Sequence, residues 1–242
     1  MAYTYLDLTN EVLARMNEVP LTSAGFNSAR GFQIQCKNAV NDSIKYINQS
    51  EFNWPFNHET QSEVLVAGTT RYSIPDTAKT VDYDTFRLVK DSSLGTNGGG
   101  LGILDYKEYL EKYVDQEDDA TVDGSVPRMV SRTPDNNFLL YPYPDKAYTL
   151  KYEYYNQPVC LSAASDVPVV PVAYRQVIAD GATSYAYQYR GETEQYQMNF
   201  QRFTGGIKHM QTLLSNRFTY VRSTVINRVG VSSPLFPSVS GS

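Results

Sequence analysis

The chain has 242 residues, of which 41% are hydrophobic and 19% charged, a composition that indicates a folded protein with a sizeable core and excludes wholesale disorder. No run approaches the roughly 18 apolar residues of a membrane span, and the first residues lack the basic start and apolar run of a secretory signal, so we expect a soluble protein. The net charge of −5 disfavours sequence-independent DNA binding, because phosphate contacts come from Lys and Arg.

The N-terminal part of the chain has the periodicity of helices. Thr4 is a candidate N-cap for a helix that extends to Glu18, and Pro20 stops it. A second helix is predicted from about residues 27–28 to the aromatic turn at 52–56. One face of this helix should be buried, because its apolar residues recur at steps of three and four: Phe32, Cys36, Ala39, Val40, Ile44 and Ile47.

Between residues 59 and 158 the hydrophobic period changes to two, which predicts strands. Residues 62–66 and 71–75 flank a short turn and are predicted to form a hairpin. Further strands are expected at 84–90, 128–132, 137–141 and 147–155, and a short helix at 106–114. The residues that alternate on one face of the last strand are Tyr148, Leu150, Tyr152 and Tyr154.

The glycine-rich run from Gly95 to Gly102 is predicted to be a flexible loop between strands. It lacks the Lys and the Ser or Thr of a phosphate-binding loop, and no strand-to-helix turn of the right kind surrounds it. Consecutive glycines also make ordering costly in backbone entropy. We therefore expect residues 93–102 to be mobile in the free protein.

Helical periodicity returns after Pro171, a residue suited to a first helical turn. Helices are predicted at 172–189 and 192–215, the second with a kink or interruption at its two adjacent glycines. The two helical ends can close on each other. The expected fold is α+β: a four-helix unit from residues 1–57 and 170–215, one antiparallel β-domain, sandwich-like or barrel-like, from 58–169, and an extended C-terminal arm from 216–242.

No constellation of residues in the sequence points to catalysis. His58 and His209 lie far apart and have no ligand spacing, so structural or solvent roles are favoured. Cys36 and Cys160 form no metal-ligand spacing and are interpreted as buried thiols in a reducing cytoplasm. The carboxylates at 105–123 could serve glycoside cleavage or bind calcium, but they lack an EF-hand pattern and fit a solvated helix and loop better. We expect no catalytic residue, cofactor or metal.

The C-terminal arm is basic. After Glu194 the chain has five basic residues and no acidic one, a polarity that suits head-to-tail contact of identical subunits or a basic arm that reaches an acidic partner. Alternation at residues 218–226 allows strand addition to a sheet edge, and two apolar residues further on could fill a pocket. A strand or tether packed on its own subunit is the alternative. The predicted interface residues are Arg217, Phe218, Tyr220, Arg222, Val225, Ile226, Arg228, Leu235 and Phe236.

Several segments, in this order and spacing, resemble phage head-to-tail adaptors of the tail tubular protein A type over about residues 5–190. The first is 10–20, with its Asn-x-x-Leu and Glu-x-Pro pattern. The others are the aromatic turn at 52–57, Tyr-Ser-Ile-Pro-Asp at 72–76, the strand at 85–89, the segment 137–145 and the tyrosine-rich strand at 148–155.

The resemblance implies a structural virion protein without catalytic residues. Such adaptors pair a helical domain with a β-domain and assemble in the host cytoplasm as a dodecameric ring under the portal protein. The ring carries the tail nozzle or the next tail protein, and it extends the channel through which genomic DNA passes without sequence-specific binding. No cofactor and no membrane are implied. In this setting the glycine loop is a candidate contact for a tail component through Gly95, Asn97, Gly98, Gly99, Gly100 and Leu101.

Two other classes of protein stay open from the sequence. A carbohydrate- or receptor-binding tail module would use the tyrosines of the β-domain, part of a total of 20, as a stacking platform. A glycan-cleaving tail enzyme would use the acidic residues at 105–123. The order of helices, strands and helices, together with the basic arm, favours the adaptor over both. Several relatives end in a helix near the portal, so the segment that docks on the portal here is left open.

Overall fold

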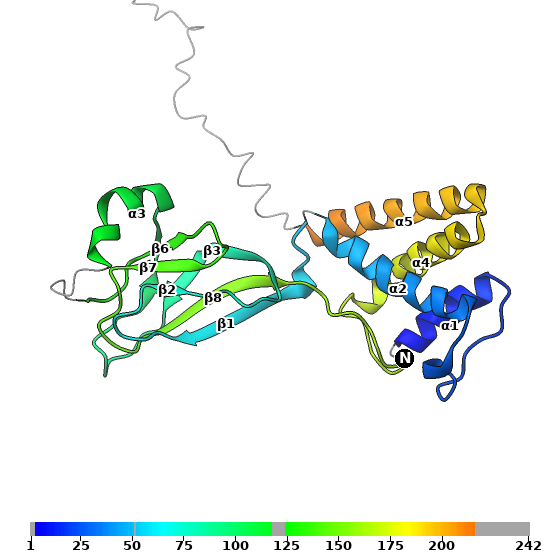
Figure 1. Ribbon diagram of the computed structural model, residues 1–242, viewed down its shortest axis with the longest axis horizontal. Helices are drawn as coiled ribbons and strands as arrows, with labels where there is room; N and C mark the ends of the chain where they lie inside the picture. Colours follow the sequence, from blue (N-terminus) through cyan, green and yellow to red (C-terminus); the bar gives the residue numbers. More distant parts are fainter. Residues whose placement is uncertain (1–2, 51, 118–123, 216–242) are drawn as a thin grey trace, which may run out of the picture.

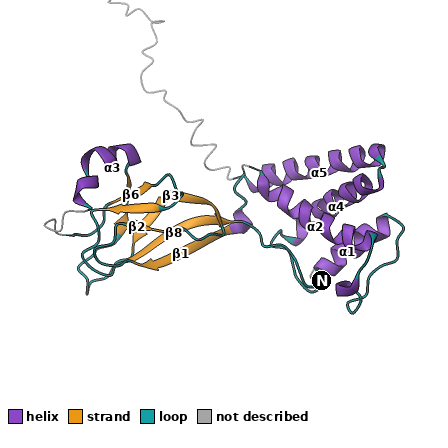
Figure 2. Ribbon diagram, viewed as in Figure 1, coloured by secondary structure: helices purple, strands orange, loops and turns teal. Residues whose placement is uncertain are grey.

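The computed structural model describes residues 3–50, 52–117 and 124–215, which form a helical body and a β-body that follow one another along the long axis of the molecule (Figure 1). Helices make up one end and strands most of the other (Figure 2). The described residues form five α-helices and two four-stranded sheets. The α+β class predicted from the sequence is therefore confirmed, whereas the predicted arm at 216–242 lies outside the described residues.

The helical body consists of the four long helices: α1 (Tyr5–Arg15), α2 (Phe32–Gln49), α4 (Arg175–Arg190) and α5 (Thr193–Leu214). Helix α1 begins at the predicted cap, because the Thr4 hydroxyl accepts a hydrogen bond from the Asp7 amide while the Asp7 carboxylate accepts one from the Thr4 amide. It ends three residues earlier than predicted. Asn17 has a φ of +56°, and the Glu18 amide donates to the Leu13 carbonyl at 2.9 Å, which is the geometry of a Schellman cap.

Helix α2 also begins later than predicted, at Phe32 instead of residues 27–28. A 3₁₀ turn, η1 (Phe26–Ser28), comes first, and Gly31 with a φ of +56° then redirects the chain into the helix. The turn exists because Phe26 is fully buried, with its ring 5.0 Å from that of Tyr5. A buried contact with α1 therefore overrides the local helical pattern.

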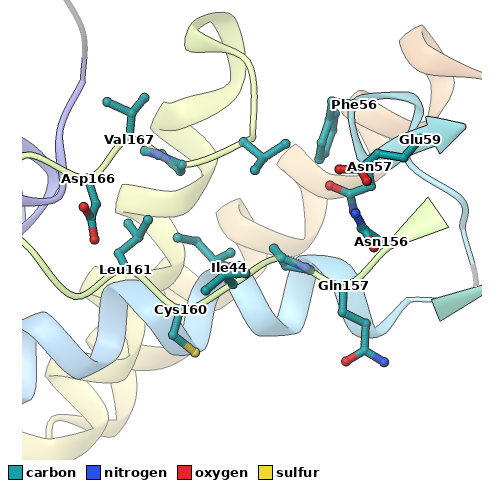
Figure 3. Close-up of a pocket in the computed structure, with 14 residues that line it drawn as sticks. Ile44, Phe56, Asn57, Glu59, Asn156, Gln157, Cys160, Leu161, Asp166 and Val167 are labelled. Atoms are coloured by element: carbon teal, nitrogen blue, oxygen red, sulfur yellow. The ribbon is translucent and has the colours of Figure 1, made fainter. Parts of the chain in front are cut away.

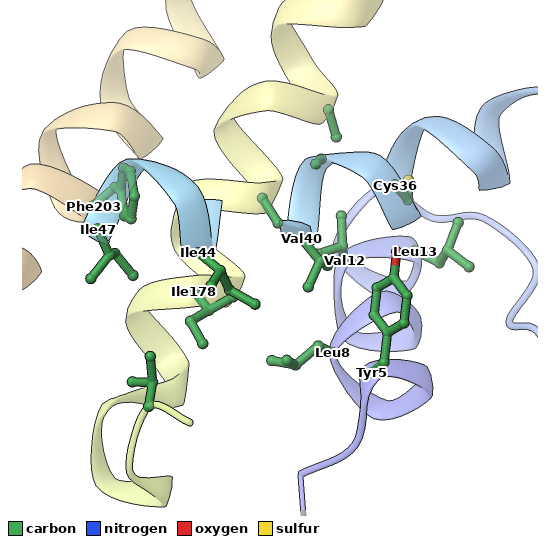
Figure 4. Packing of buried hydrophobic residues seen from close by; sticks show 14 of the residues in the cluster. Tyr5, Leu8, Val12, Leu13, Cys36, Val40, Ile44, Ile47, Ile178 and Phe203 are labelled. Atoms are coloured by element: carbon green, nitrogen blue, oxygen red, sulfur yellow. The ribbon is translucent and has the colours of Figure 1, made fainter. Parts of the chain in front are cut away.

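The core of the helical body lies where α2 crosses α1 and α4 (Figure 4). Leu8, Val12, Val40, Ile47 and Ile178 are completely buried there, each contributing about 1.5–3 kcal/mol through burial of apolar surface. The apolar stripe predicted on α2 faces this core. Within the described residues, no helix combines the length and the hydropathy that crossing a membrane requires.

Helix α5 runs without interruption through its adjacent glycines, so the predicted kink is wrong. The glycines instead allow two helices to approach closely. A Cβ on Gly206 would lie 2.9 Å from a methyl group of Val177 in α4, and a Cβ on Gly181 of α4 would lie 2.6 Å from the ring of Phe203 in α5. Packing of α4 on α5 therefore outweighs the conformational cost of glycine within a helix.

The β-body contains two sheets. The strands of the first sheet, in spatial order, are β1 (His58–Val64), β8 (Thr149–Asn156), β3 (Ala78–Leu88) and β4 (Gly99–Gly100). Those of the second sheet are β2 (Arg71–Tyr72), β7 (Phe138–Tyr141), β6 (Met129–Arg132) and β5 (Gly102–Ile103). All pairs are antiparallel except β5 with β6. The rings of Phe86, Phe138 and Tyr152 pack between them at centroid distances of 4.5–5.5 Å. The alternating face predicted for the last strand is this buried face.

The hairpin predicted from residues 62–66 and 71–75 is wrong, because β1 pairs with β8 and β2 pairs with β7 in the other sheet. The segment between them crosses from one sheet to the other. The Leu65 amide donates to the Tyr148 carbonyl on one side, and the Leu140 amide donates to the Thr70 carbonyl on the other, at 2.8 and 2.9 Å. Both arrangements produce the same local alternation, so the pattern alone did not distinguish a hairpin from a crossing.

The second half of the glycine run is paired, which differs from the flexible loop predicted at residues 93–102. Residues 99–100 form β4 beside β3, and β5 follows beside β6. Leu101 between them is only 7% exposed and donates its amide to the Phe86 carbonyl at 2.8 Å. Burial of one leucine between the sheets thus offsets the backbone entropy that the sequence argument had emphasised.

Candidate functional site

Within the described residues, no group of three or more His, Cys, Asp or Glu side chains is placed to hold a metal ion. The His58 Nε2 lies 3.0 Å from a Glu153 carboxylate oxygen, and Arg87 Nη1 lies 3.3 Å from the other oxygen. The hydrogen bond from His58, followed by that from Arg87, lowers the pKa of Glu153. This is an exposed cluster of charges on one face of a sheet.

The predicted helix over residues 106–114 is present as α3 (Tyr106–Lys112), capped by Asp105. It lies at the end of the β-body that is remote from the helical body (Figure 1). The Glu108 carboxylate of α3 is exposed and lies 2.6 Å from Lys112 Nζ on the same helix. Glu117, which follows α3, is half-buried and accepts two hydrogen bonds from Arg71. The acidic residues of α3 therefore belong to a charged surface, and Arg71 of β2 binds the segment that follows this helix.

A groove of about 370 Å³ opens at the junction of the two bodies (Figure 3). Ile44 of α2 forms one wall, and the end of β8 with the connection that follows it forms another. Three valines of this connection line the groove and are largely exposed: Val159 at 79%, Val169 at 55% and Val167 at 45%. We call these three residues the valine patch. Exposed apolar groups gathered at a groove are typical of contact surfaces.

The connection that carries the valine patch is held firmly on the helical body. The Asn41 side chain of α2 both donates to the Leu161 carbonyl at 3.0 Å and accepts from the Leu161 amide at 2.9 Å. The Asp166 carboxylate accepts from two backbone amides of the connection, chiefly that of Ser162, which lowers its pKa. The Tyr5 amide of α1 donates to the Asp166 carbonyl at 2.7 Å. The valines are thus presented in a fixed geometry.

A buried arginine supports the far end of the same connection. Arg175, at the start of α4, is 5% exposed and donates to the carbonyls of Tyr3, Val170 and Pro168. Burial lowers the pKa of its guanidinium. Three backbone carbonyls therefore replace the water that this cation loses, and they tie the connection to the N-terminus of α1.

The sequence prediction missed the valine patch. A signal was available, because residues 167–172 read Val-Pro-Val-Val-Pro-Val and carry neither helical nor strand periodicity. Cys160 corrects a further prediction: it lies exposed beside the patch, whereas Cys36 is buried as expected. In the predicted contact loop, Gly95, Asn97, Gly99 and Gly100 are exposed and Gly98 is half-buried, but Leu101 belongs to the core. The predicted interface residues of the arm lie outside the described residues.

Two comparisons with known proteins address the family of this chain. No match was found among curated proteins. The model of the family described as SU10 adaptor protein matches residues 3–227, which is nearly the whole chain. This is a family of phage head-to-tail adaptors, as the sequence resemblance had predicted. The chain therefore belongs to the SU10 adaptor protein family.

Proposed function

We infer that this chain has a structural role in joining the head and tail of a phage, a role that its family supports. Beyond this, we propose that identical copies form a ring, dodecameric as in the adaptors that the sequence resembles, between the portal protein and the next tail protein. The ring would extend the DNA channel and be part of the neck or tail of the virion, after assembly in the host cytoplasm. The observation that carries this proposal is the valine patch, because a rigid apolar surface at a groove favours a protein partner.

The shape and charge of the chain fit a ring subunit. Its two bodies lie end to end (Figure 1), so the helical body (1–57 and 170–215) and the β-body (58–169) would act as separate domains, one toward each neighbour in the particle. The chain carries a net charge of −5. A channel wall of this character would hold DNA weakly, because it offers few cations to phosphate, and weak contacts would favour DNA ejection.

The C-terminal arm would act as a clamp on a second copy or on the portal. It carries arginines without acidic residues and cannot bury its apolar residues by itself. The glycine loop would contact a tail component, with Asn97 and the exposed glycines taking part and Leu101 in a supporting role.

Two observations count against the other classes of protein. Three tyrosines in β8 or directly before it that would form a carbohydrate-stacking platform face the core: Tyr148 is 1% exposed, Tyr152 is buried completely and Tyr154 is 5% exposed. The acidic residues of α3 pair with Lys112 and Lys107 on the surface of that helix. An adaptor without enzymatic activity is the function that the site supports best.

Co-sedimentation with portal particles tests this proposal. Purified protein is mixed with the particles across a series of salt concentrations, and bound protein is measured in the pellet. We expect saturable binding, with a fixed number of copies on each portal. A protein that stays in the supernatant at every salt concentration would refute the adaptor ring.

A further inference from the structure

Strand β1 is a long free edge. The ends of the two sheets are β1 and β4 in one, and β2 and β5 in the other. Three of these strands have two residues each, whereas β1 has seven and pairs with β8 in one unbroken register. Among the described residues, no backbone hydrogen bond joins the outer side of β1 to another segment. A long edge without a bulge is a template for an added strand.

The side chains on the core-facing side of this edge are polar and only partly paired. Glu59, Gln61 and Glu63 lie opposite Tyr154, Tyr152 and Leu150 of β8. Glu59 accepts a hydrogen bond from the Tyr154 hydroxyl at 2.9 Å. Among the described residues, no hydrogen bond or ion pair reaches the half-buried Glu63 carboxylate, whose pKa is raised by burial. An unpaired carboxylate of this kind favours a strand that brings hydrogen-bond donors.

The charge of the edge decides which strand fits it. A second copy of β1, paired antiparallel about Gln61, would set Glu59 opposite Glu63 twice, and like charges in directly opposed positions are destabilising. A basic strand is favoured instead. Residues 217–228 of this chain supply three arginines, no acidic residue, and the β-branched and aromatic residues that strands prefer.

Chain direction indicates whose arm fits. Strand β1 starts at the junction and runs away from the helical body, while α5 ends at the junction (Figure 1). An antiparallel partner must enter at the Val64 end, about 20 Å or more from the start of a seven-residue strand. If Arg222 pairs with Glu63, Val221 lies opposite Val64, so the chain's own arm would have to cover this distance with residues 216–221. Six residues span at most about 20–22 Å, so its own arm would reach that end only as a fully extended tether. The arm of another copy has no such constraint and is favoured.

We propose that the outer edge of β1 accepts residues 217–228 of a second copy as an added antiparallel strand, with Arg222 on the Glu63 carboxylate. The inference rests on the proposed ring of identical copies, and it identifies β1 as the strand that accepts the C-terminal arm of another copy. The ring would thereby be closed by backbone hydrogen bonds, with the Arg-to-Glu contact fixing the register.

Disulfide trapping between different chains tests the pairing. In a Cys160→Ser background, which leaves the buried Cys36 as the remaining cysteine, one protein carries Ser62→Cys and a second, with a size tag, carries Val221→Cys or Ser223→Cys. If Arg222 shares the face of Glu63, these arm positions share the face of Ser62. The proteins are mixed on portal particles, oxidised and separated on non-reducing gels. Thermal melts check that each variant folds like the Cys160→Ser parent.

Lys151→Cys supplies the matched control, because Lys151 lies directly opposite Ser62 on β8, one strand further in. An added strand would lie about 9–10 Å from it, beyond the roughly 7 Å that a disulfide spans between Cα atoms. A covalent heterodimer with Ser62→Cys that is at least tenfold more abundant than with Lys151→Cys supports the proposal.

Other outcomes overturn it in distinguishable ways. A further variant carries Ser62→Cys and the arm cysteine in one chain. A crosslink that forms only within this single chain would show the arm on its own β1. Particle-bound rings without any crosslink would overturn the strand pairing and leave the proposed function intact. Failure to bind particles at all, with no heterodimer, would overturn both.

Discussion

Val159 offers the most direct perturbation of the proposed contact surface. Its side chain is 79% exposed at the mouth of the junction groove. Burying a valine fully contributes about 1.5–3 kcal/mol, so covering this one in a ring would contribute about 1–2 kcal/mol per contact. The substitution Val159→Asp removes that term and adds the cost of desolvating a carboxylate. We expect binding to portal particles to weaken at least tenfold, since 1.4 kcal/mol corresponds to a factor of ten.

The measurement pairs co-sedimentation with thermal melting, and Val19→Asp is the control. Val19 is 72% exposed but lies in the connection between α1 and α2, outside the groove. Surface substitutions usually change the free energy of unfolding by less than about 0.5 kcal/mol, so both variants should melt within about 2 °C of the wild type. Equal particle binding by the two variants would refute the role of the valine patch.

Three further predictions follow from the described contacts. Gly181→Ala should lower the free energy of unfolding by about 1 kcal/mol or more, because its Cβ would lie 2.6 Å from an aromatic ring. Gly205→Ala meets nothing within 4 Å and should raise the free energy of unfolding by about 0.5–1 kcal/mol. Equal denaturant midpoints for the two variants would contradict the close α4–α5 packing. Burial raises the pKa of Glu63, so the carboxyl costs no stability while protonated and destabilises the fold as the pH rises through the raised pKa; Glu63→Gln should therefore raise the melting temperature at pH 8 and leave it unchanged at pH 3. A thiol reagent at pH 8 should label Cys160 rapidly and Cys36 slowly, since Cys36 is buried and its pKa is raised to about 12; equal labelling rates would show that α2 opens readily.

The sequence was most informative where local chemistry decides the structure. The cap at Thr4, the apolar stripe of α2 and the alternating face of β8 all form as predicted, because each depends on neighbours in the chain. It was least informative where distant segments compete. The crossing near Gly68 depends on β8 and β7 as partners, and the burial of Leu101 depends on two sheets that meet only in the fold.

The candidate site shows the same division. The charge of the arm could be read from residue types alone. The valine patch could not be predicted in this way, because its exposure depends on how the connection is held. Asn41, which is distant in the chain, and Arg175 both hold the connection through hydrogen bonds to its backbone. Likewise, the free edge of β1 is visible only after β8 is known to occupy its other side.

Particle imaging tests the central claim most directly. Purified protein is imaged alone and after mixing with portal particles, and the two sets of images are compared. The adaptor ring predicts largely monomeric protein on its own and a closed ring of repeated subunits seated on the portal in the mixture, with the channel continued through its centre. Portal particles that carry no added density, or isolated copies bound at scattered positions, would contradict it.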